Sequence, residues 1–418
     1  MSVLDSVEMH PNVVSQNLAI SQQQLQTKGI QSSTGPIVNF STSGNLLIDS
    51  KLNTNLYRAA TSSRAYLDGL ISAKIPLYDF GQADARISSS IFLENSAKLQ
   101  YDDAKEAMLQ KLLDLTVEAS RLQSIEVLLK NDNIQTNKHL AEARTLFQAG
   151  VITIEQVRTI QLAQLNTESE LHLLAIKQKE TLDNLKKEFL ITTEVQEIFA
   201  LIQDLISSQK NKKQGLLDLI EQNSTTALSA RTTSKTQEDI NALQQQIFSI
   251  EAAKKPQIEG TLTATLYDIT RNIEEYQVSG GLNVALPLFD SGLSAVQIQS
   301  AIHNIDVENE KLRGALFEKQ LALVNLIQKA NTLKSRHSSN LIKKDEMNAK
   351  LVNLELSRKI SQNNFAETLQ TQLEINALKR ELLNYDYMIL QANIMYLRLN
   401  ESLLGAFTEL NKNKLTAK

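Results

Sequence analysis

The heptapeptides IPLYDFG at residues 75–81 and LPLFDSG at residues 286–292 are nearly identical, and they lie 211 positions apart. This offset is about half of the 418 residues of the chain. Such a spacing suggests that one structural unit was copied and fused to itself. The flanking residues test this hypothesis, because a true duplication should repeat the same structural pattern around both heptapeptides.

The residues before each heptapeptide proline alternate between apolar and polar side chains. In the second copy Val278, Leu282 and Val284 share one face, and Gln277 and Asn283 share the other. Period-two alternation is typical of a strand with one apolar and one polar face. A second alternating segment precedes this one, and the first half repeats both more weakly. The sequence therefore predicts strands at about 36–48, 64–76, 257–268 and 276–287.

The residues after each heptapeptide follow a helical period instead. The segments 82–148 and 293–360 contain no proline, and at roughly 1.5 Å per residue each predicts a helical rod on the order of 100 Å. A stripe with three-four spacing follows the second rod, interrupted by Lys319, and it is typical of a coiled-coil seam. Its members are Leu312, Leu316, Leu323, Leu326, Ala330 and Leu333, and the first copy repeats it with Leu112, Leu115, Ala119 and Leu122.

Each rod is expected to turn back on itself. Gly150 can take the left-handed conformation that ends a helix, and Ser361 is its counterpart in the second copy. Both lie 74 residues beyond their heptapeptide proline, so the two hairpins should have equal arms. Return helices at about 153–222 and 365–408 and shorter helices at 3–33 and 236–254 complete two structural repeats, residues 1–222 and 223–418.

Composition excludes several classes of protein. The net charge is −4 without a basic block, so nucleic acid is not an expected partner. The chain has no cysteine, which excludes a disulfide framework and a thiolate metal site. Five histidines without metal-ligand spacing and the lack of any nucleotide or hydrolase motif indicate a protein that is not an enzyme and needs no cofactor or metal.

The start of the chain leaves two explanations open. No stretch approaches the roughly 18 apolar residues of a membrane-spanning helix, and MSVLDSVEMHPNVV lacks the regions of a signal peptide. The protein is therefore either cytosolic or a mature secreted chain whose signal was replaced by a start methionine.

Four strands with one apolar and one polar face predict a membrane protein. The apolar face suits lipid and the Thr-, Ser-, Asn- and Gln-rich face suits water, while an open strand edge is not tolerated in hydrocarbon. Other protomers must then complete the wall. Two would give eight strands around a filled interior, and three would give twelve around an aqueous lumen. Aromatic residues near the strand ends fit an interfacial girdle: Phe40, Tyr66, Tyr78, Tyr267, Tyr276 and Phe289.

The chain resembles the TolC-like outer-membrane factors. The resemblance rests on the duplicated PL-aromatic-D-x-G turn, on HPNVVSQNLAISQQQLQ near the start and on FQAGVITIEQV at the first hairpin. It implies a mostly α-helical trimer with a transmembrane β portion: a twelve-stranded barrel in the bacterial outer membrane, continued by a long periplasmic barrel of twelve helices. It also implies partners, namely a periplasmic adaptor (membrane fusion) protein and an inner-membrane pump or ABC transporter.

The resemblance also implies site residues at the hairpin tips. Adaptor contacts are expected at Phe147, Gly150 and Val151 in the first copy and at Ser361 and Asn363 in the second. A second set is expected to line a closing aperture. Glu367 stands where the first aperture acid belongs, but Gln370 occupies the place of the second and Arg358 stands at a usual aromatic position.

Two functional hypotheses follow from these patterns. The first is a passive conduit that exports substrates through the outer membrane for a tripartite efflux pump or a type I secretion system, which the sequence does not distinguish. The alternative is a coiled-coil structural scaffold outside the membrane, whose alternating segments form an adhesive sheet. The equal hairpin arms favour the conduit, because a scaffold has no need to align its two tips.

Overall fold

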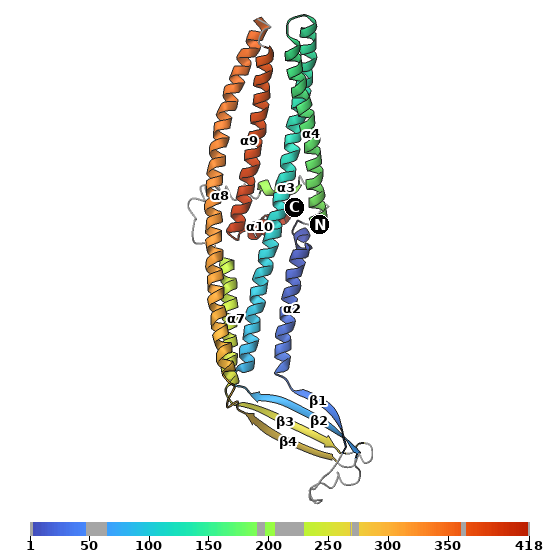
Figure 1. The fold of residues 1–418 in the computed structure, drawn as a ribbon, viewed down its shortest axis with the longest axis vertical. Coiled ribbons are helices and arrows are strands. Elements are labelled where there is room, and N and C mark those ends of the chain that lie inside the picture. The colour runs from blue at the N-terminus through green and yellow to red at the C-terminus, as the bar shows by residue number, and fades with distance from the viewer. Residues whose placement is uncertain are drawn as a thin grey trace, which may run out of the picture. The chain divides into compact units, whose positions relative to one another are not determined.

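The computed structural model describes residues 3–46, 65–189, 197–204, 230–267, 269, 276–360 and 365–416. It combines long helices with a small antiparallel sheet (Figure 1). The first half of the chain contains α1 (Val3–Glu8), α2 (Pro11–Ser33), β1 (Ile37–Leu46), β2 (Ala65–Tyr78), α3 (Gln82–Gln148) and α4 (Ile154–Phe189). The second half contains α7 (Ala230–Ala253), β3 (Gln257–Leu266), β4 (Tyr276–Ala285), α8 (Leu293–Ile360), α9 (Phe365–Leu399) and α10 (Leu403–Thr416).

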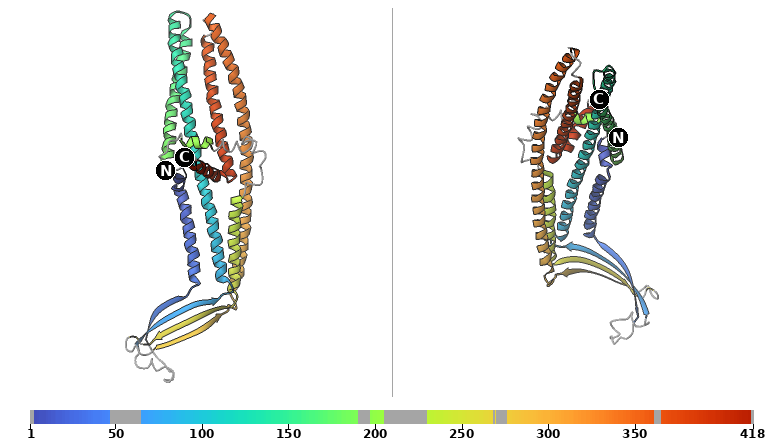
Figure 2. Two further views of the ribbon diagram at one scale, coloured as in Figure 1. Left: turned by 180° about the vertical axis from the view of Figure 1, so that it is seen from behind. Right: turned by 45° about the horizontal axis from the view of Figure 1, so that its top comes forward.

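The four strands form one antiparallel sheet in the order β1-β2-β3-β4. Figure 2 shows them as a single curved layer, and strands that are neighbours in this layer are also consecutive strands along the chain. Residues 47–64 and 270–275, between the two strands of each pair, lie outside the described residues. The two predicted strand pairs thus lie side by side, joined through β2 and β3.

Two of the helices predicted as continuous are broken in the structure. The opening helix is divided at His10, because Pro11 lacks an amide proton and starts a new helix while His10 Nδ1 accepts a hydrogen bond from the Asn12 amide at 3.2 Å. The last return helix stops at Leu399 and resumes at Leu403, because Glu401 takes a left-handed conformation with φ of 55°. The predictions of single helices at 3–33 and 365–408 were therefore wrong.

The chain forms two compact units that do not follow the repeats. The sheet unit comprises residues 17–100 and 232–313, and the hairpin unit comprises residues 1–16, 101–231 and 314–418. Each unit therefore combines segments of both halves of the sequence.

The core of the hairpin unit consists of large apolar side chains. Leu112 and Leu323, related by the offset of 211 residues, are both buried. The main cluster lies where α3, α9 and α10 meet and includes Leu109, Leu112, Leu113, Val117, Ile394 and Phe407. Most residues of the predicted apolar seam are thus buried, and Leu115, Leu312 and Leu316 are partly buried.

Candidate functional site

The two faces of the sheet have different chemistry. The register places Val38, Ala73 and Leu262 in one cross-strand row and Phe40, Ile71, Ala264 and Val278 in another. These rows lie on the same face, because side chains two residues apart along a strand point the same way. Its apolar side chains are not covered: Val38 is 66% exposed, Phe40 65% and Leu282 73%.

The opposite face of the sheet is polar. Asn39, Ser72, Thr263 and Ser279 form one cross-strand row there. The hydroxyl groups of Thr263 and Ser279 lie 2.6 Å apart and share a hydrogen bond. One face thus presents hydrocarbon and the other presents hydrogen-bonding groups, as the period-two alternation predicts.

The duplicated heptapeptides form the same turn twice. Asp79 accepts hydrogen bonds from the amides of Gly81 at 3.1 Å and Ala83 at 2.6 Å. Asp290 accepts from the amides of Gly292 and Ser294, both at 3.0 Å. Hydrogen bonds from the Ser294 side chain and then from these two amides lower the pKa of Asp290. Both aspartates cap the helix that follows.

The two residues after each aspartate take positive φ values. Phe80 and Ser291 both have φ of 54°, and Gly81 and Gly292 both have φ of 82°. Only glycine adopts the second of these conformations without strain. The glycine of each heptapeptide therefore turns the chain from the strand into the long helix.

The first hairpin tip is a compact turn at Gly150, whose φ is 73°. The Gly150 amide donates to the Phe147 carbonyl and the Val151 amide donates to the Leu146 carbonyl, both at 2.9 Å, as in a Schellman motif. Thr153 and Gln156 then exchange hydrogen bonds between side chain and amide, which is a capping box at the start of α4. Phe147 and Val151 are exposed beside this turn.

The second tip is described only in part. Ser361 and Asn363 lie outside the described residues, and Arg358 lies within α8. Glu367 is exposed and forms an ion pair with Lys350 at 3.0 Å. The Gln370 amide donates instead to Glu374, one turn along α9, at 3.2 Å. The ion pair thus links Glu367 to the long helix α8, whereas this hydrogen bond of the Gln370 side chain stays within α9.

The hairpin unit buries an ionic cluster that the sequence analysis did not predict. Its centre is Glu106 on α3, which is completely buried. Glu106 accepts hydrogen bonds from Arg231 at 2.6 Å, from Arg398 at 3.3 Å and from the Leu404 amide at 3.1 Å. Buried carboxylates are tolerated when they are paired in this way.

Glu401 extends this cluster to α8. One of its carboxylate oxygens accepts from the Arg231 amide at 2.5 Å, and the other pairs with Lys319. Lys319 is the residue that interrupts the apolar stripe of the second rod, so this interruption was the one signal of the cluster in the sequence. The Arg231 amide and the Lys319 ammonium group thus hold the Glu401 carboxylate at the break between α9 and α10.

None of the described helices combines the length and the apolar character that a bilayer-spanning helix requires. The described residues also contain no group of three or more histidine, aspartate or glutamate side chains placed to hold a metal ion.

The sequence matches no protein-family model and no curated protein. The structure nevertheless resembles solved outer-membrane channels. VceC, an outer membrane protein of Vibrio cholerae, superimposes with a TM-score of 0.73 and 12% identity over 97% of this chain and 94% of its own. The CmeC outer membrane channel of Campylobacter jejuni gives a TM-score of 0.72 and 13% identity over 95% of this chain and 84% of its own.

A third such structure is the MtrE outer membrane channel of Neisseria gonorrhoeae, with a TM-score of 0.67 and 10% identity over 97% of this chain and 87% of its own. At these identities the likeness concerns the fold. The chain has the fold of outer-membrane channels, as its resemblance to the TolC-like outer-membrane factors implied.

Proposed function

We propose that the protein is one protomer of a trimeric channel-tunnel in the bacterial outer membrane, which exports substrates passively. The observation that carries this proposal is the sheet: one face is apolar and uncovered, with Leu282 73% exposed, while the other is polar. A folded soluble protein normally buries the apolar face of a sheet against another layer. Lipid would cover this face in an outer-membrane barrel, and water would fill the polar side.

The edges of the sheet support the need for sister subunits. Among the described strands, β1 pairs only with β2 and β4 pairs only with β3. Hydrocarbon does not tolerate the unpaired amide and carbonyl groups of an open edge. If β4 of one protomer pairs with β1 of the next, three protomers form a closed barrel of twelve strands. Two protomers would close a barrel of eight strands, and side chains fill the interior of a barrel of that size. A conduit therefore requires the trimer.

We place the partner contacts at the tips of the two hairpins. Phe147, Gly150 and Val151 form an exposed, hydrogen-bonded turn that could serve as a docking surface. Ser361 and Asn363 would be their counterparts in the second copy. The partners would be a periplasmic adaptor protein and an inner-membrane pump or ABC transporter. Both a tripartite efflux pump and a type I secretion system fit this arrangement.

The aperture is proposed to lie beside the second tip. Three copies of Glu367 around the axis would form an anionic ring that favours cations. The ion pair with Lys350 at 3.0 Å would reduce the charge of this ring while the pair is intact. We propose that Gln370 and Arg358 line the same aperture.

The test is reconstitution of the purified protein. The full chain in detergent should have the mass of a trimer by light scattering, and it should produce single-channel conductance in planar lipid bilayers. Replacement of Glu367 by Gln should lower the preference for cations, measured as a smaller reversal potential in a KCl gradient.

A coiled-coil scaffold would behave differently in the same assays. It would remain in solution without detergent and would give no conductance, and either result would contradict the proposed channel. Unchanged reversal potentials in the Glu367→Gln variant would remove only Glu367 from the aperture.

A further inference from the structure

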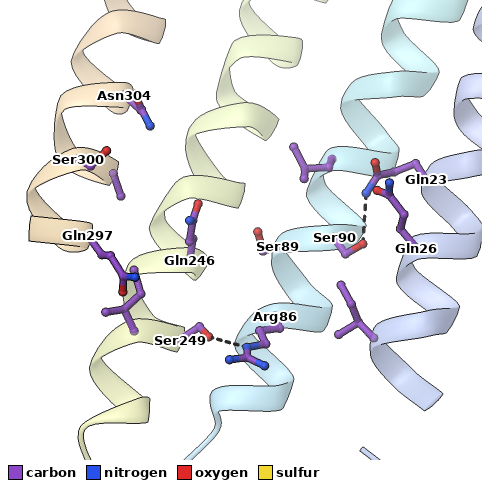
Figure 3. A pocket seen from close by; sticks show the side chains of 14 residues that line it. Gln23, Gln26, Arg86, Ser89, Ser90, Gln246, Ser249, Gln297, Ser300 and Asn304 are labelled. Carbon is purple, nitrogen blue, oxygen red and sulfur yellow. Dashed lines mark hydrogen bonds between the residues drawn. The ribbon is translucent and has the colours of Figure 1, made fainter. Parts of the chain in front are cut away.

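The sheet unit contains a cavity of about 510 Å³ that is lined by all four of its helices, α2, α3, α7 and α8. Figure 3 shows the side chains that face it. Most of them are glutamines and serines, with Asn304 from α8, and Ile30 and Leu93 are among the few apolar members. Arg86 is the one charged residue among those that line this cavity. Its wall thus offers many neutral hydrogen-bonding groups and one positive charge.

Arg86 is available to a ligand. It lies in the second turn of α3, and its side chain is exposed. Its Nε donates to the Ser249 hydroxyl on α7 at 3.3 Å, as Figure 3 shows. In the part of the chain that the structure describes, the guanidinium group has no ion pair with a carboxylate. Ser249 therefore orients the guanidinium group of Arg86. The two terminal nitrogens of this group can then donate to an anion in the forked geometry that suits carboxylates and phosphates.

The neighbouring side chains keep this region of the cavity polar without adding a negative charge. The Ser90 hydroxyl accepts a hydrogen bond from Gln23 at 3.3 Å and shares one with Thr27 at 2.7 Å. Asp84, two residues before Arg86 on α3, does not line this cavity. Glu94, further along the helix, accepts from Gln24 at 3.2 Å and pairs with Lys98 at 2.7 Å, so its charge is already compensated. An anion in the cavity would therefore meet no unpaired carboxylate from its own wall.

Arg86 also links this cavity to the polar face of the sheet. Together with Ile30 it lines a second cavity of about 270 Å³, whose wall includes Lys74, Gln257 and Glu259 from the strands. Along their strands these three residues alternate with the residues of the apolar face. They therefore belong to the polar face, which water would contact in a closed barrel. Lys74 and Glu259 bring one positive and one negative charge to this wall, and Asp79 in the same wall is occupied by the cap of α3.

We propose that Arg86 forms a cargo site in the channel wall that binds small, hydroxyl-rich organic anions. This inference rests on the proposed function, because Arg86 meets cargo only if the polar face of the sheet lines a conduit. The cargo class follows from the wall: one guanidinium pairs with a carboxylate or phosphate, and the surrounding amides and hydroxyls bind hydroxyl groups. Three copies around the axis form a ring that concentrates anions at the junction between strands and helices.

The first experiment measures binding to the full-length protein in detergent by isothermal titration calorimetry. Glucose 6-phosphate serves as the anionic probe and glucose as its uncharged counterpart. Glucose 6-phosphate should bind at least tenfold more tightly than glucose. Arg86→Gln should remove this difference, and Arg86→Lys should restore part of it, because lysine keeps the charge but loses the fork. Arg313→Gln is the control, since Arg313 is 81% exposed and already lies beside Glu310.

The second experiment measures reversal potentials in a KCl gradient. Arg86→Gln should shift the preference of the conducting protein toward cations, while Arg313→Gln should not. Equal binding of both probes by the unsubstituted protein, or unchanged binding and selectivity in Arg86→Gln, would overturn the cargo site. Absence of conductance in every variant would instead contradict the proposed channel, and the binding measurements would still report on the cavity.

Discussion

The two compact units of the chain differ in the apolar side chains that they bury. In the hairpin unit Leu109, Leu112 and Val117 are completely buried, as the core of an independent fold requires. In the sheet unit Leu18 and Leu25 on α2 are 63% and 68% exposed, although they lie one heptad apart on the helix. Both units expose some apolar side chains, since Ile342 in the hairpin unit is 70% exposed. Among the described residues of the sheet unit, however, the buried apolar side chains are Ile240 and four alanines, so this unit has no core of large side chains comparable to that of the hairpin unit.

The largest expected effect comes from charging this uncovered stripe. Leu18 and Leu25 have the spacing of a coiled-coil seam toward a helix that is absent from a single chain. If a sister subunit supplies that helix, Leu18→Asp/Leu25→Asp should abolish the trimer in detergent, because each interface would bury two charges against apolar side chains. Light scattering of the purified protein gives the result.

The control for the stripe is Leu18→Met/Leu25→Met, which keeps the stripe apolar and should still assemble. A trimer of the aspartate variant with normal stability would show that subunits do not meet along α2. The sheet unit would then have to be covered in some other way.

A substitution inside the hairpin unit should instead lower stability without changing how subunits meet. Glu106→Gln leaves Arg231 and Arg398 without their shared carboxylate, and breaking a buried charge cluster of this kind costs about 3–5 kcal/mol. The free energy of unfolding in urea, read from the circular dichroism of the helices, should fall by that amount. A loss below about 1 kcal/mol would mean that the cluster contributes little to the core.

Glu106 also marks the limit of what the sequence predicts. Local periodicity determines which side of a strand or helix is apolar, so the bounds of the long helices and the two faces of the sheet could be predicted from it. The offset of 211 residues pairs Glu106 with Phe317, yet the glutamate is completely buried and the phenylalanine is 66% exposed. Burial of Glu106 depends on Arg231 and Arg398, which lie 125 and 292 residues away in the sequence.

The candidate sites show the same limit. Gly150 could be recognised because a left-handed helix end favours glycine, and the Asp79 and Asp290 caps because an aspartate before a helix has a local role. Arg86 could not be recognised, because its cavity is formed by four helices from both halves of the chain. Only the assembled sheet unit brings Arg86 next to Ser249, which is 163 residues away.

Asp114 offers a smaller effect within the same core. Burial raises its pKa from 3.8 to about 6, and a hydrogen bond from Gln110 lowers it only in part. Because the folded state holds the proton more tightly than the unfolded state, stability should fall as the pH rises from about 4 to about 6. Asp114→Asn should therefore stabilise the protein by about 1–3 kcal/mol near pH 8, and this gain should shrink toward zero near pH 4.

Urea unfolding at several pH values measures this effect. Asp345→Asn serves as the matched control, since the Asp345 side chain is 68% exposed and its loss should change stability little at any pH. A gain for Asp114→Asn that is the same at pH 4 and pH 8 would show that the removed charge is not its cause.

The smallest expected effect on stability comes from the Asp79 and Asp290 caps. They have the same hydrogen-bond geometry but differ in how exposed they are to solvent. Asp79 is half-buried beside the strands, and its removal leaves the Gly81 and Ala83 amides without an acceptor, so Asp79→Ala should cost about 1 kcal/mol. Asp79→Asn keeps an acceptor and should cost less. Hydrogen exchange of the Ala83 amide measures this loss directly.

The second cap should respond more weakly, because Asp290 lies in water and solvent can replace its carboxylate. Since the pKa of Asp290 is lowered, its stabilising effect is present above the ordinary pKa of 3.8 and is lost as the pH falls through the lowered value. Asp290→Ala should therefore speed exchange at the Ser294 amide less than Asp79→Ala speeds it at Ala83. If a sister subunit covers this turn, assembly should make the exchange rates of the two variants more similar. If both substitutions speed exchange equally in the isolated chain, exposure does not distinguish the two caps.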